Sequence, residues 1–125
     1  MARPAAKELT ERELEVMHTF WKHGEQTAHD ARNQLESQGI ERAYVTVANL
    51  VRILFEKGYL KPVNDQRPFR YIPTRSFEDV SKNLVGDLVR RVFHGSREQL
   101  LVNLVQAKKL TKKEKSVLRS LLEDE

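Results

Sequence analysis

Hydrophobic side chains recur at helical spacing through most of the chain. The first segment has its apolar positions at Leu14, Val16, Met17, Phe20 and Trp21. Thr10 and Glu13 precede it with the spacing of a capping box, in which each side chain accepts a hydrogen bond from the other residue's backbone amide. Gly24 follows as a typical helix stop. This pattern predicts a helix over residues 11–23.

Two more helical patterns follow the first. Thr27 and Asp30 have the spacing of a helix cap, and the short helix that they open has its inward face at Ala28, Ala31 and Leu35 and its stop at Gly39. The third pattern closes at Gly58 and places apolar residues at i, i+3, i+4 and i+7, namely Val47, Leu50, Val51 and Leu54. The sequence therefore predicts three short helices in succession.

Beyond the third helix the period changes from helical to alternating. Residues 59–63 and 69–72 read as strands on either side of residues 64–68, a cluster of turn formers, which predicts a two-stranded hairpin. Pro62 and Pro68 restrict the strands to sheet edges because proline cannot donate a ladder hydrogen bond. A lone hairpin is marginal in water, so we expect it to pack on the helices.

Three capped helices complete the chain, predicted over 77–93, 97–108 and 112–123. Their caps are Ser76 with Asp79, Ser96 with Gln99, and Thr111 with Glu114. About fifty residues in three helices form a thin core, so we expect a homodimer to bury their apolar stripes. The expected dimer contacts are Leu84, Leu88, Leu101, Leu104, Val105, Val117, Leu118, Leu121 and Leu122.

Three helices followed by a hairpin is the order of elements in a winged helix. The predicted fold is mainly α, with a winged helix-turn-helix domain over 8–75 and a three-helix dimerisation region over 76–125. In a helix-turn-helix the second helix lies in the DNA major groove and its N-terminal residues reach base edges, while the wing contacts the backbone. The third helix is therefore the expected recognition helix.

At 100° per residue, the side chains of the third helix that point away from its buried stripe belong to Val45, Asn49, Arg52 and Glu56, with Thr46 and Ala48 at the sides. Asn49 can pair with adenine and Arg52 with guanine or phosphate. Val45 and Ala48 are small enough to meet a thymine methyl group. Each residue taken singly also reads as an ordinary surface residue, so the interpretation rests on the combination.

Expected contacts to the DNA backbone lie on the wing and at the entry to the third helix. The wing candidates are Lys61, Asn64, Arg67 and Arg70. Arg42 precedes the third helix, where the helix dipole already favours a phosphate, and Tyr44 at the start of that helix is a further expected DNA contact. Such contacts add affinity and register rather than sequence choice. The same charges also read as ordinary solvated charges of a small hairpin.

Charge is unevenly distributed along the 125 residues. Lys and Arg number 5 against 8 Asp and Glu in residues 1–41, 7 against 2 in residues 42–75, and 10 against 8 in residues 76–125. The positive excess coincides with the predicted recognition helix and wing. Such a distribution is typical of a phosphate-binding surface, although a solvated basic face would read the same way.

Composition gives no indication of an enzyme. There is no cysteine, and His18, His23, His29 and His94 are scattered without a His-Glu-x-x-His pair. We therefore expect no catalytic residues, no metal site and no cofactor. No apolar run approaches the roughly 18 residues of a membrane span, and MARPAAKE lacks the apolar stretch of a secretory signal. The expectation is a cytoplasmic protein without membrane insertion.

Several runs of the sequence resemble one family of regulators. They are LTERELEVMHTFWKHGEQTAHD, AYVTVANLVRILFEKGYL, the wing ending FRYIPT, and the tail runs VFHGSREQLLVNLV and LTKKEKSVLRSLL. Together they resemble the penicillinase-repressor family, which also includes methicillin-resistance and copper-responsive repressors, over residues 9 to 122. The resemblance implies a homodimeric winged-helix repressor that binds palindromic operators in double-stranded DNA, with Thr46, Asn49 and Arg52 on the recognition helix.

The sequence also departs from the family pattern. Some members begin the recognition helix with Ser-Pro, whereas Ala43 and Tyr44 stand here, so we expect Tyr44 packing to hold the helix entry. A chain without cysteine excludes the copper-sensing tail. In antibiotic-responsive members a membrane-bound sensor metalloprotease cuts an Asn-Phe bond in the dimerisation helices. The resemblance places that site at Asn103 and Leu104, with leucine in place of phenylalanine.

The main alternative is a winged helix that serves as a protein-interaction module, because fold does not fix function. That alternative predicts weak, sequence-independent binding to DNA. The charge asymmetry favours DNA recognition instead. So does the expected dimer, because two linked recognition helices gain avidity on a palindrome.

Overall fold

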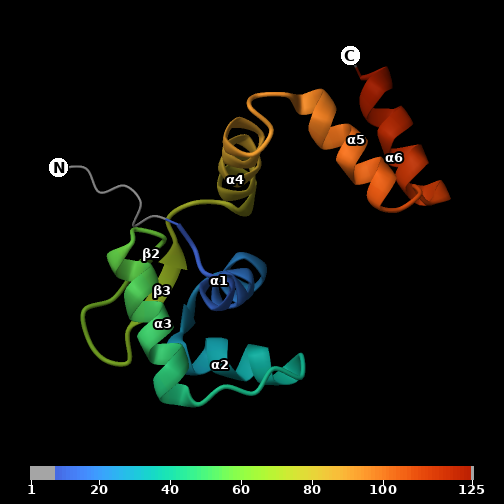
Figure 1. The fold of residues 1–125 in the computed structure, drawn as a ribbon. Coiled ribbons are helices and arrows are strands. Elements are labelled where there is room, and N and C mark those ends of the chain that lie inside the picture. Colours follow the sequence, from blue (N-terminus) through green and yellow to red (C-terminus); the bar gives the residue numbers. More distant parts are fainter. Residues whose placement is uncertain (1–7, 125) are drawn as a thin grey trace. The chain divides into compact units, whose positions relative to one another are not determined.

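The computed structural model describes residues 8–124, which form six helices and three short strands (Figure 1). In chain order these are α1 (Glu11–His23), β1 (Gln26–Thr27), α2 (Ala28–Ser37), α3 (Tyr44–Glu56), β2 (Leu60–Pro62), β3 (Arg70–Pro73), α4 (Phe77–Arg91), α5 (Arg97–Ala107) and α6 (Lys112–Glu123). The chain divides within α4 into two compact units, one ending at Val80 and the other beginning at Ser81.

Side-chain caps fix the starts of the helices in the first unit. The Thr10 hydroxyl accepts from the Glu13 amide at 3.1 Å, and the Glu13 carboxylate accepts from the Thr10 amide at 3.0 Å. Thr27 and Asp30 repeat this capping box at the start of α2. The predicted bounds of the first helix, 11–23, are confirmed.

One hydrophobic core joins the helices and strands of the first unit. Its buried members are Val16, Met17, Phe20, Ala31, Leu35, Val47, Val51, Leu54, Tyr59, Leu60 and Val80. The predicted inward faces of the first three helices are therefore largely confirmed. Trp21, Ala28 and Leu50 are partly buried and pack against the core. Leu14 is half-buried and is not a member of it. Trp21 Nε1 donates to the Arg75 carbonyl at 2.9 Å and so attaches the segment after the wing to α1.

The sheet has three antiparallel strands in the order β1-β3-β2. The predicted two-stranded hairpin is present, and β1 adds a third strand through the pairs Gln26 with Tyr71 and Thr27 with Arg70. A two-residue strand is too short to show alternation, and its Thr27 also caps α2, so the sequence pattern did not reveal it. Through β1 the wing is hydrogen-bonded to the start of α2.

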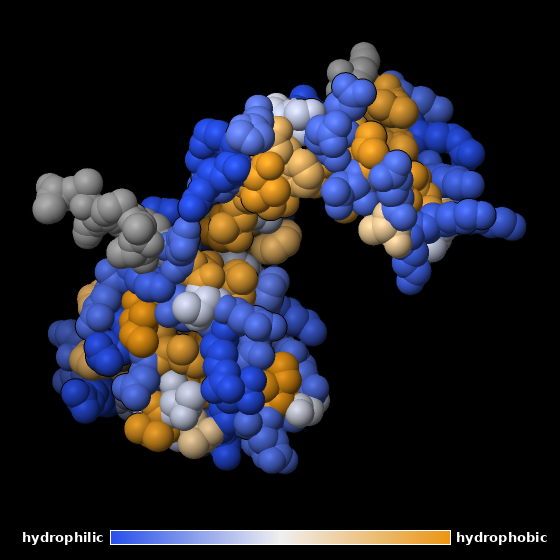
Figure 2. All heavy atoms as spheres, in the orientation of Figure 1, coloured by the Kyte–Doolittle hydropathy of each residue, from blue (hydrophilic) through white to orange (hydrophobic). Residues whose placement is uncertain are grey.

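Apolar side chains remain exposed in the second unit. No described residue of α5 or α6 is buried, and Leu101, Leu104, Leu121 and Leu122 are each more than half exposed. A cleft of about 570 Å³ lies between α4 and α5 and has Val85, Gly86, Val89 and Leu101 among its lining residues. Figure 2 shows hydrophobic residues at the surface of α4, α5 and α6. Such a surface is typical of helices that pack against a partner.

No helix in residues 8–124 has both the length and the apolar character required to cross a lipid bilayer.

An ion pair joins the end of α3 to the start of α1. Lys57 Nζ donates to Glu13 Oε1 at 2.8 Å and to the Glu8 carbonyl at 2.7 Å. The Glu13 side chain is only 6% exposed, so its carboxylate depends on Lys57 and the Thr10 amide in place of water.

We expect Lys57→Met to lower the free energy of unfolding by about 1–3 kcal/mol, because the nearly buried Glu13 carboxylate loses its cation. Urea denaturation followed by the fluorescence of Trp21, the only tryptophan, measures the change. Lys61→Met on the exposed wing is the control and should stay within about 0.5 kcal/mol of the parent. Equal losses in both variants would contradict a specific role for Lys57.

Candidate nucleic-acid interface

The outer face of α3 carries small and hydrogen-bonding side chains. Val47, Val51 and Leu54 are buried, and this fixes the rotation of the helix about its axis. Val45 consequently projects outward with 64% of its surface exposed. Asn49, Arg52 and Glu56 are also exposed, whereas Thr46 and Ala48 are intermediate at the sides. The structure therefore presents the six residues in the arrangement that helical periodicity predicts.

Arg52 is held by a neighbour on its own helix. Its Nη1 lies 2.9 Å from Glu56 Oε2, in an i,i+4 pair whose two side chains are each 57% exposed. An exposed pair of this kind contributes only about 0.3–0.5 kcal/mol. The guanidinium of Arg52 is thus available to a stronger partner such as a guanine edge or a phosphate.

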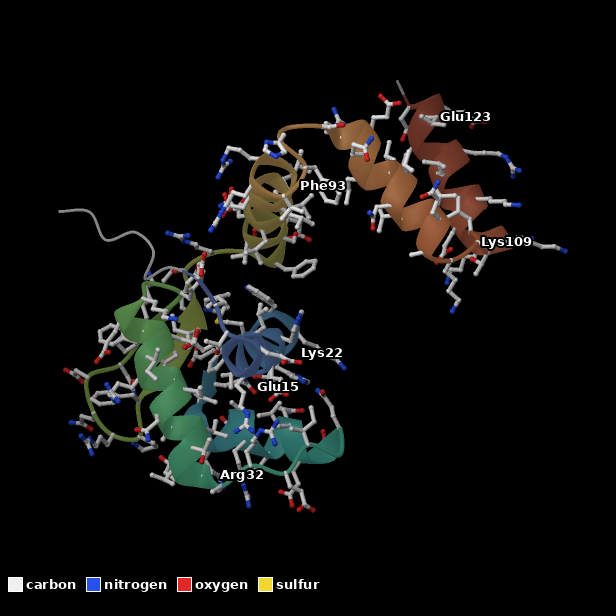
Figure 3. The ribbon with its side chains drawn as sticks, in the orientation of Figure 1. Glu15, Lys22, Arg32, Phe93, Lys109 and Glu123 are labelled. Carbon is white, nitrogen blue, oxygen red and sulfur yellow. The ribbon has the colours of Figure 1, made fainter. Side chains whose placement is uncertain are left out.

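Arg42 is committed to the architecture of the helix-turn-helix. Its Nη2 donates to both carboxylate oxygens of Glu15 at 3.1 Å, and its carbonyl accepts from Arg32 Nε at 3.4 Å. Figure 3 labels Glu15 on α1 and Arg32 on α2, the two helices that Arg42 connects. The N-cap of α3, Ala43, makes no side-chain capping bond. The Arg42 contacts therefore hold the chain where it enters α3.

Tyr44 contributes less to this entry than the sequence suggested. Its side chain is 52% exposed, and its ring centroid lies 6.0 Å from that of His29 on α2. The two rings instead form one wall of a cleft of about 420 Å³ between α2, α3 and the wing. The side chains that line it include His29, Tyr44, Ala48, Arg67, Phe69 and Tyr71.

Three aromatic or imidazole residues of this cleft were absent from the predicted site, namely His29, Phe69 and Tyr71. Phe69 and Tyr71 alternate along the predicted strand 69–72, so they share one face of it. This alternation is the feature of the sequence from which the two aromatic residues could have been predicted to lie together. His29 stands in the first turn of α2, and only the fold brings it beside Tyr44.

The electrostatics of the cleft favour a neutral phenol beside a cation. Burial raises the pKa of the Tyr71 phenol above its ordinary value of 10.0, while the nearby charge of Arg67 acts in the opposite direction. Tyr71 is therefore a hydrogen-bond donor at neutral pH. The Arg67 guanidinium lies 5.8 Å from the Phe69 ring centroid, within the range of a cation–π contact.

Two of the four predicted wing contacts serve the wing itself. The Asn64 side-chain amide donates to the carbonyls of Gln66 and Pro68, and its Oδ1 accepts from the Arg70 amide at 2.9 Å. Arg70 Nε lies 2.6 Å from Glu25 Oε2. Lys61 and Arg67 form no ion pair with any residue in the described part of the chain, so they are the wing cations available to a phosphate.

The remaining predicted positions lie in the second unit. Asn103 and Leu104, the expected proteolytic site, stand on α5, where Leu104 is 58% exposed. The expected dimer contacts are all exposed on α4, α5 and α6, at Leu84, Leu88, Leu101, Leu104, Val105, Val117, Leu118, Leu121 and Leu122.

Comparison with known proteins places residues 9–124 in one family. The family model described as penicillinase repressor matches residues 9–124. The methicillin resistance regulatory protein MecI of Mammaliicoccus sciuri is 24% identical over 115 residues, which are 92% of this chain and 93% of that protein. The penicillinase repressor of Bacillus licheniformis is 24% identical over 117 residues, covering 94% of this chain and 91% of its own.

The first unit also has a counterpart among solved structures. The solution structure of the DNA binding domain of the repressor BlaI matches with a TM-score of 0.52 and 26% identity. The match covers 63% of this chain and 93% of that domain. The predicted winged-helix fold is thereby confirmed.

We expect Arg42→Gln to lower the free energy of unfolding by about 1–2 kcal/mol, because a charge-assisted contact between partly buried groups is lost. Urea denaturation followed by Trp21 fluorescence provides the measurement. Arg67→Gln is the matched control and should stay within about 0.5 kcal/mol. An unchanged stability of the Arg42 variant would show that this arginine does not hold the helix entry.

Proposed function

The chain belongs to the penicillinase repressor family, and we propose that it is a sequence-specific DNA-binding transcriptional repressor, not an enzyme. It acts in the cytoplasm as a homodimer on a palindromic operator. The observation that carries the proposal is the outer face of α3, where Val45, Asn49 and Arg52 stand exposed on a winged helix similar to the DNA binding domain of BlaI.

Base recognition is assigned to the first three turns of α3. Asn49 offers a side-chain amide that can pair with adenine, and Arg52 offers a guanidinium whose two N–H groups can pair with one guanine. Val45 and Ala48 leave room for the backbone of α3 to approach thymine methyl groups. The weak Glu56 contact orients Arg52 without holding it, because an exposed ion pair dissociates at small cost.

Backbone contacts are assigned to the wing and the cleft beside it. Lys61 and Arg67 supply positive charge, and the neutral Tyr71 phenol supplies a hydrogen-bond donor for a phosphate oxygen. Arg42 acts indirectly, because its partly buried guanidinium holds the entry of α3 against Glu15. Arg70 pairs with Glu25 through a more exposed contact, so its guanidinium can exchange this partner for a phosphate.

Dimerisation is assigned to the second unit, whose apolar side chains are exposed in the single chain. Burial of this apolar surface drives association, because each Å² removed from water contributes about 25 cal/mol of favourable free energy. A two-fold dimer would present two recognition helices to the two halves of a palindrome.

Relief of repression by proteolysis is proposed for the Asn103–Leu104 bond, with a membrane-bound sensor metalloprotease as the partner. Leu104 is exposed on α5, so its side chain is accessible in the single chain. Cleavage there would sever α6 from the rest of the second unit and so weaken dimerisation. Incubation with the cognate protease and no cut near residue 103 would remove this part of the proposal.

We expect Arg52→Ala to cost about 1–3 kcal/mol of binding free energy on a selected operator and to relax preference at one base position. Arg67→Ala should instead weaken binding to all duplexes alike and reduce the salt slope by about one. Fluorescence anisotropy at several salt concentrations, on the operator and on a scrambled duplex, separates the two effects. Identical behaviour of the two variants would contradict the division into base and backbone contacts.

We expect Leu118→Asp to convert the dimer into a monomer, because a carboxylate would be placed in the apolar stripe of α6. Sedimentation velocity of the full chain measures the change. Ser120→Asp is the control, since it adds the same charge to α6 away from the stripe and should leave the dimer intact. A dimeric Leu118 variant would show that the interface lies elsewhere.

A further inference from the structure

The charge of the second unit is concentrated around the turn between α5 and α6. Residues 108–115 contain five lysines and one glutamate, a net charge of +4, which equals the net charge of the whole chain. None of the five lysines forms an ion pair with a described residue, and the Glu114 carboxylate is engaged in the cap of α6 with Thr111. None of the DNA contacts proposed for α3 and the wing involves these lysines.

Apart from Glu114, which belongs to the N-terminal cap, the charges at the ends of α6 are arranged against its own helix dipole. Lys112, Lys113 and Lys115 stand at its N-terminal end, whereas Glu123 and Asp124 stand at its C-terminal end. Figure 3 shows Lys109 and Glu123 near opposite ends of this helix. A helix dipole favours the reverse order, acids first and bases last, so this arrangement costs stability in the isolated helix.

The same order is favourable when two copies of α6 lie antiparallel. The basic end of each helix then meets the acidic end of the other, whereas a parallel pair would bring like charges together at both ends. The apolar stripe of α6 supplies the contact between them, with Val117, Leu118, Leu121 and Leu122 all at least 42% exposed. Charge complementarity therefore identifies the occupant of this face as a second copy of the chain.

Helical geometry selects one ion pair from these charges. Lys113 and Asp124 are eleven positions apart, or about three turns, so they lie on the same flank of the stripe. In an antiparallel pair related by a two-fold axis, equivalent flanks face each other. One register sets Leu118 opposite Leu121 of the second copy. In that register Lys113 and Asp124 of the second copy are offset by two positions, or about 3 Å along the helix axis.

We propose that α6 packs antiparallel against α6 of a second copy, with Lys113 paired to Asp124 of that copy at both ends of the contact. This rests on the homodimer of the proposed function and deepens it, because the pairing specifies orientation and partner. Flanking charges select partners in helix pairs, so a relative without this pattern would be disfavoured in mixed dimers.

The test is the dimer dissociation constant of the full chain, measured by sedimentation equilibrium at low and near-physiological salt. We expect Lys113→Glu and Asp124→Lys each to raise it about tenfold, since two attractive pairs become repulsive. The double variant should return to within about twofold of the parent, because reversed charges pair equally well. Mixing the two single variants should give heterodimers in preference to either homodimer.

The matched control exchanges Lys112 and Glu123 in the same way. These residues are also eleven positions apart, but they lie on the face of α6 opposite the stripe, so neither their single nor their double reversal should change the constant. Equal effects of the two sets would show that only the net charge of the helix ends matters and would overturn the proposed pair.

Two further results would overturn the proposal. Single variants that dimerise as tightly as the parent would exclude the ion pair while leaving the dimer of the proposed function in place. A Lys113→Glu dimer of parental stability that binds all duplex DNA more weakly would assign the lysines to phosphate contacts instead. A parent that selects no DNA motif would count against the proposed function alone, because the sedimentation measurement contains no DNA.

Discussion

Burial of Val47, Val51 and Leu54 between α1 and α2 is the constraint on which the rest of the first unit depends. A helix that buries one stripe has no freedom to rotate about its axis, so the opposite face is determined as well. That face carries Val45, Asn49 and Arg52. The side chains proposed to read DNA are therefore positioned by apolar residues that never touch it.

Polar contacts hold the two ends of α3 and the wing in addition to the apolar core. Arg42 connects the entry of α3 to α1, Lys57 connects its end to the same helix, and Arg70 connects the wing to Glu25. Each of these cations is paired with a carboxylate inside the first unit. A surface rich in arginine and lysine thus divides into residues that maintain geometry and a smaller set, including Lys61 and Arg67, that remain available for an external anion.

Much of the first unit could be predicted because its signals are local. The capping box at Thr10, the glycine stops and the 3.6-residue period determine where helices begin, end and face, and the structure agrees with them. The strand β1 could not be predicted, since two residues show no period and their pairing with β3 depends on the tertiary fold.

The candidate site was predictable only in part for a related physical reason. Periodicity determines which side chains point outward, so the face of α3 followed from sequence. It does not determine which cations find carboxylates from distant segments. Arg42 meets Glu15 across 27 positions and Arg70 meets Glu25 across 45, and neither pairing leaves a mark in the local sequence. The cleft containing His29, Phe69 and Tyr71 likewise exists only once three elements have packed together.

The proposed function requires that two copies of this chain recognise a symmetric DNA sequence. Selection of bound molecules from a pool of random duplex DNA by the purified full chain, at near-physiological salt, tests it most directly. We expect recovery of a two-fold symmetric motif whose half-sites lie about one helical turn apart. Recovery of no motif, with all retention lost as salt is raised, would contradict sequence-specific recognition, because only nonspecific attraction to phosphate would remain.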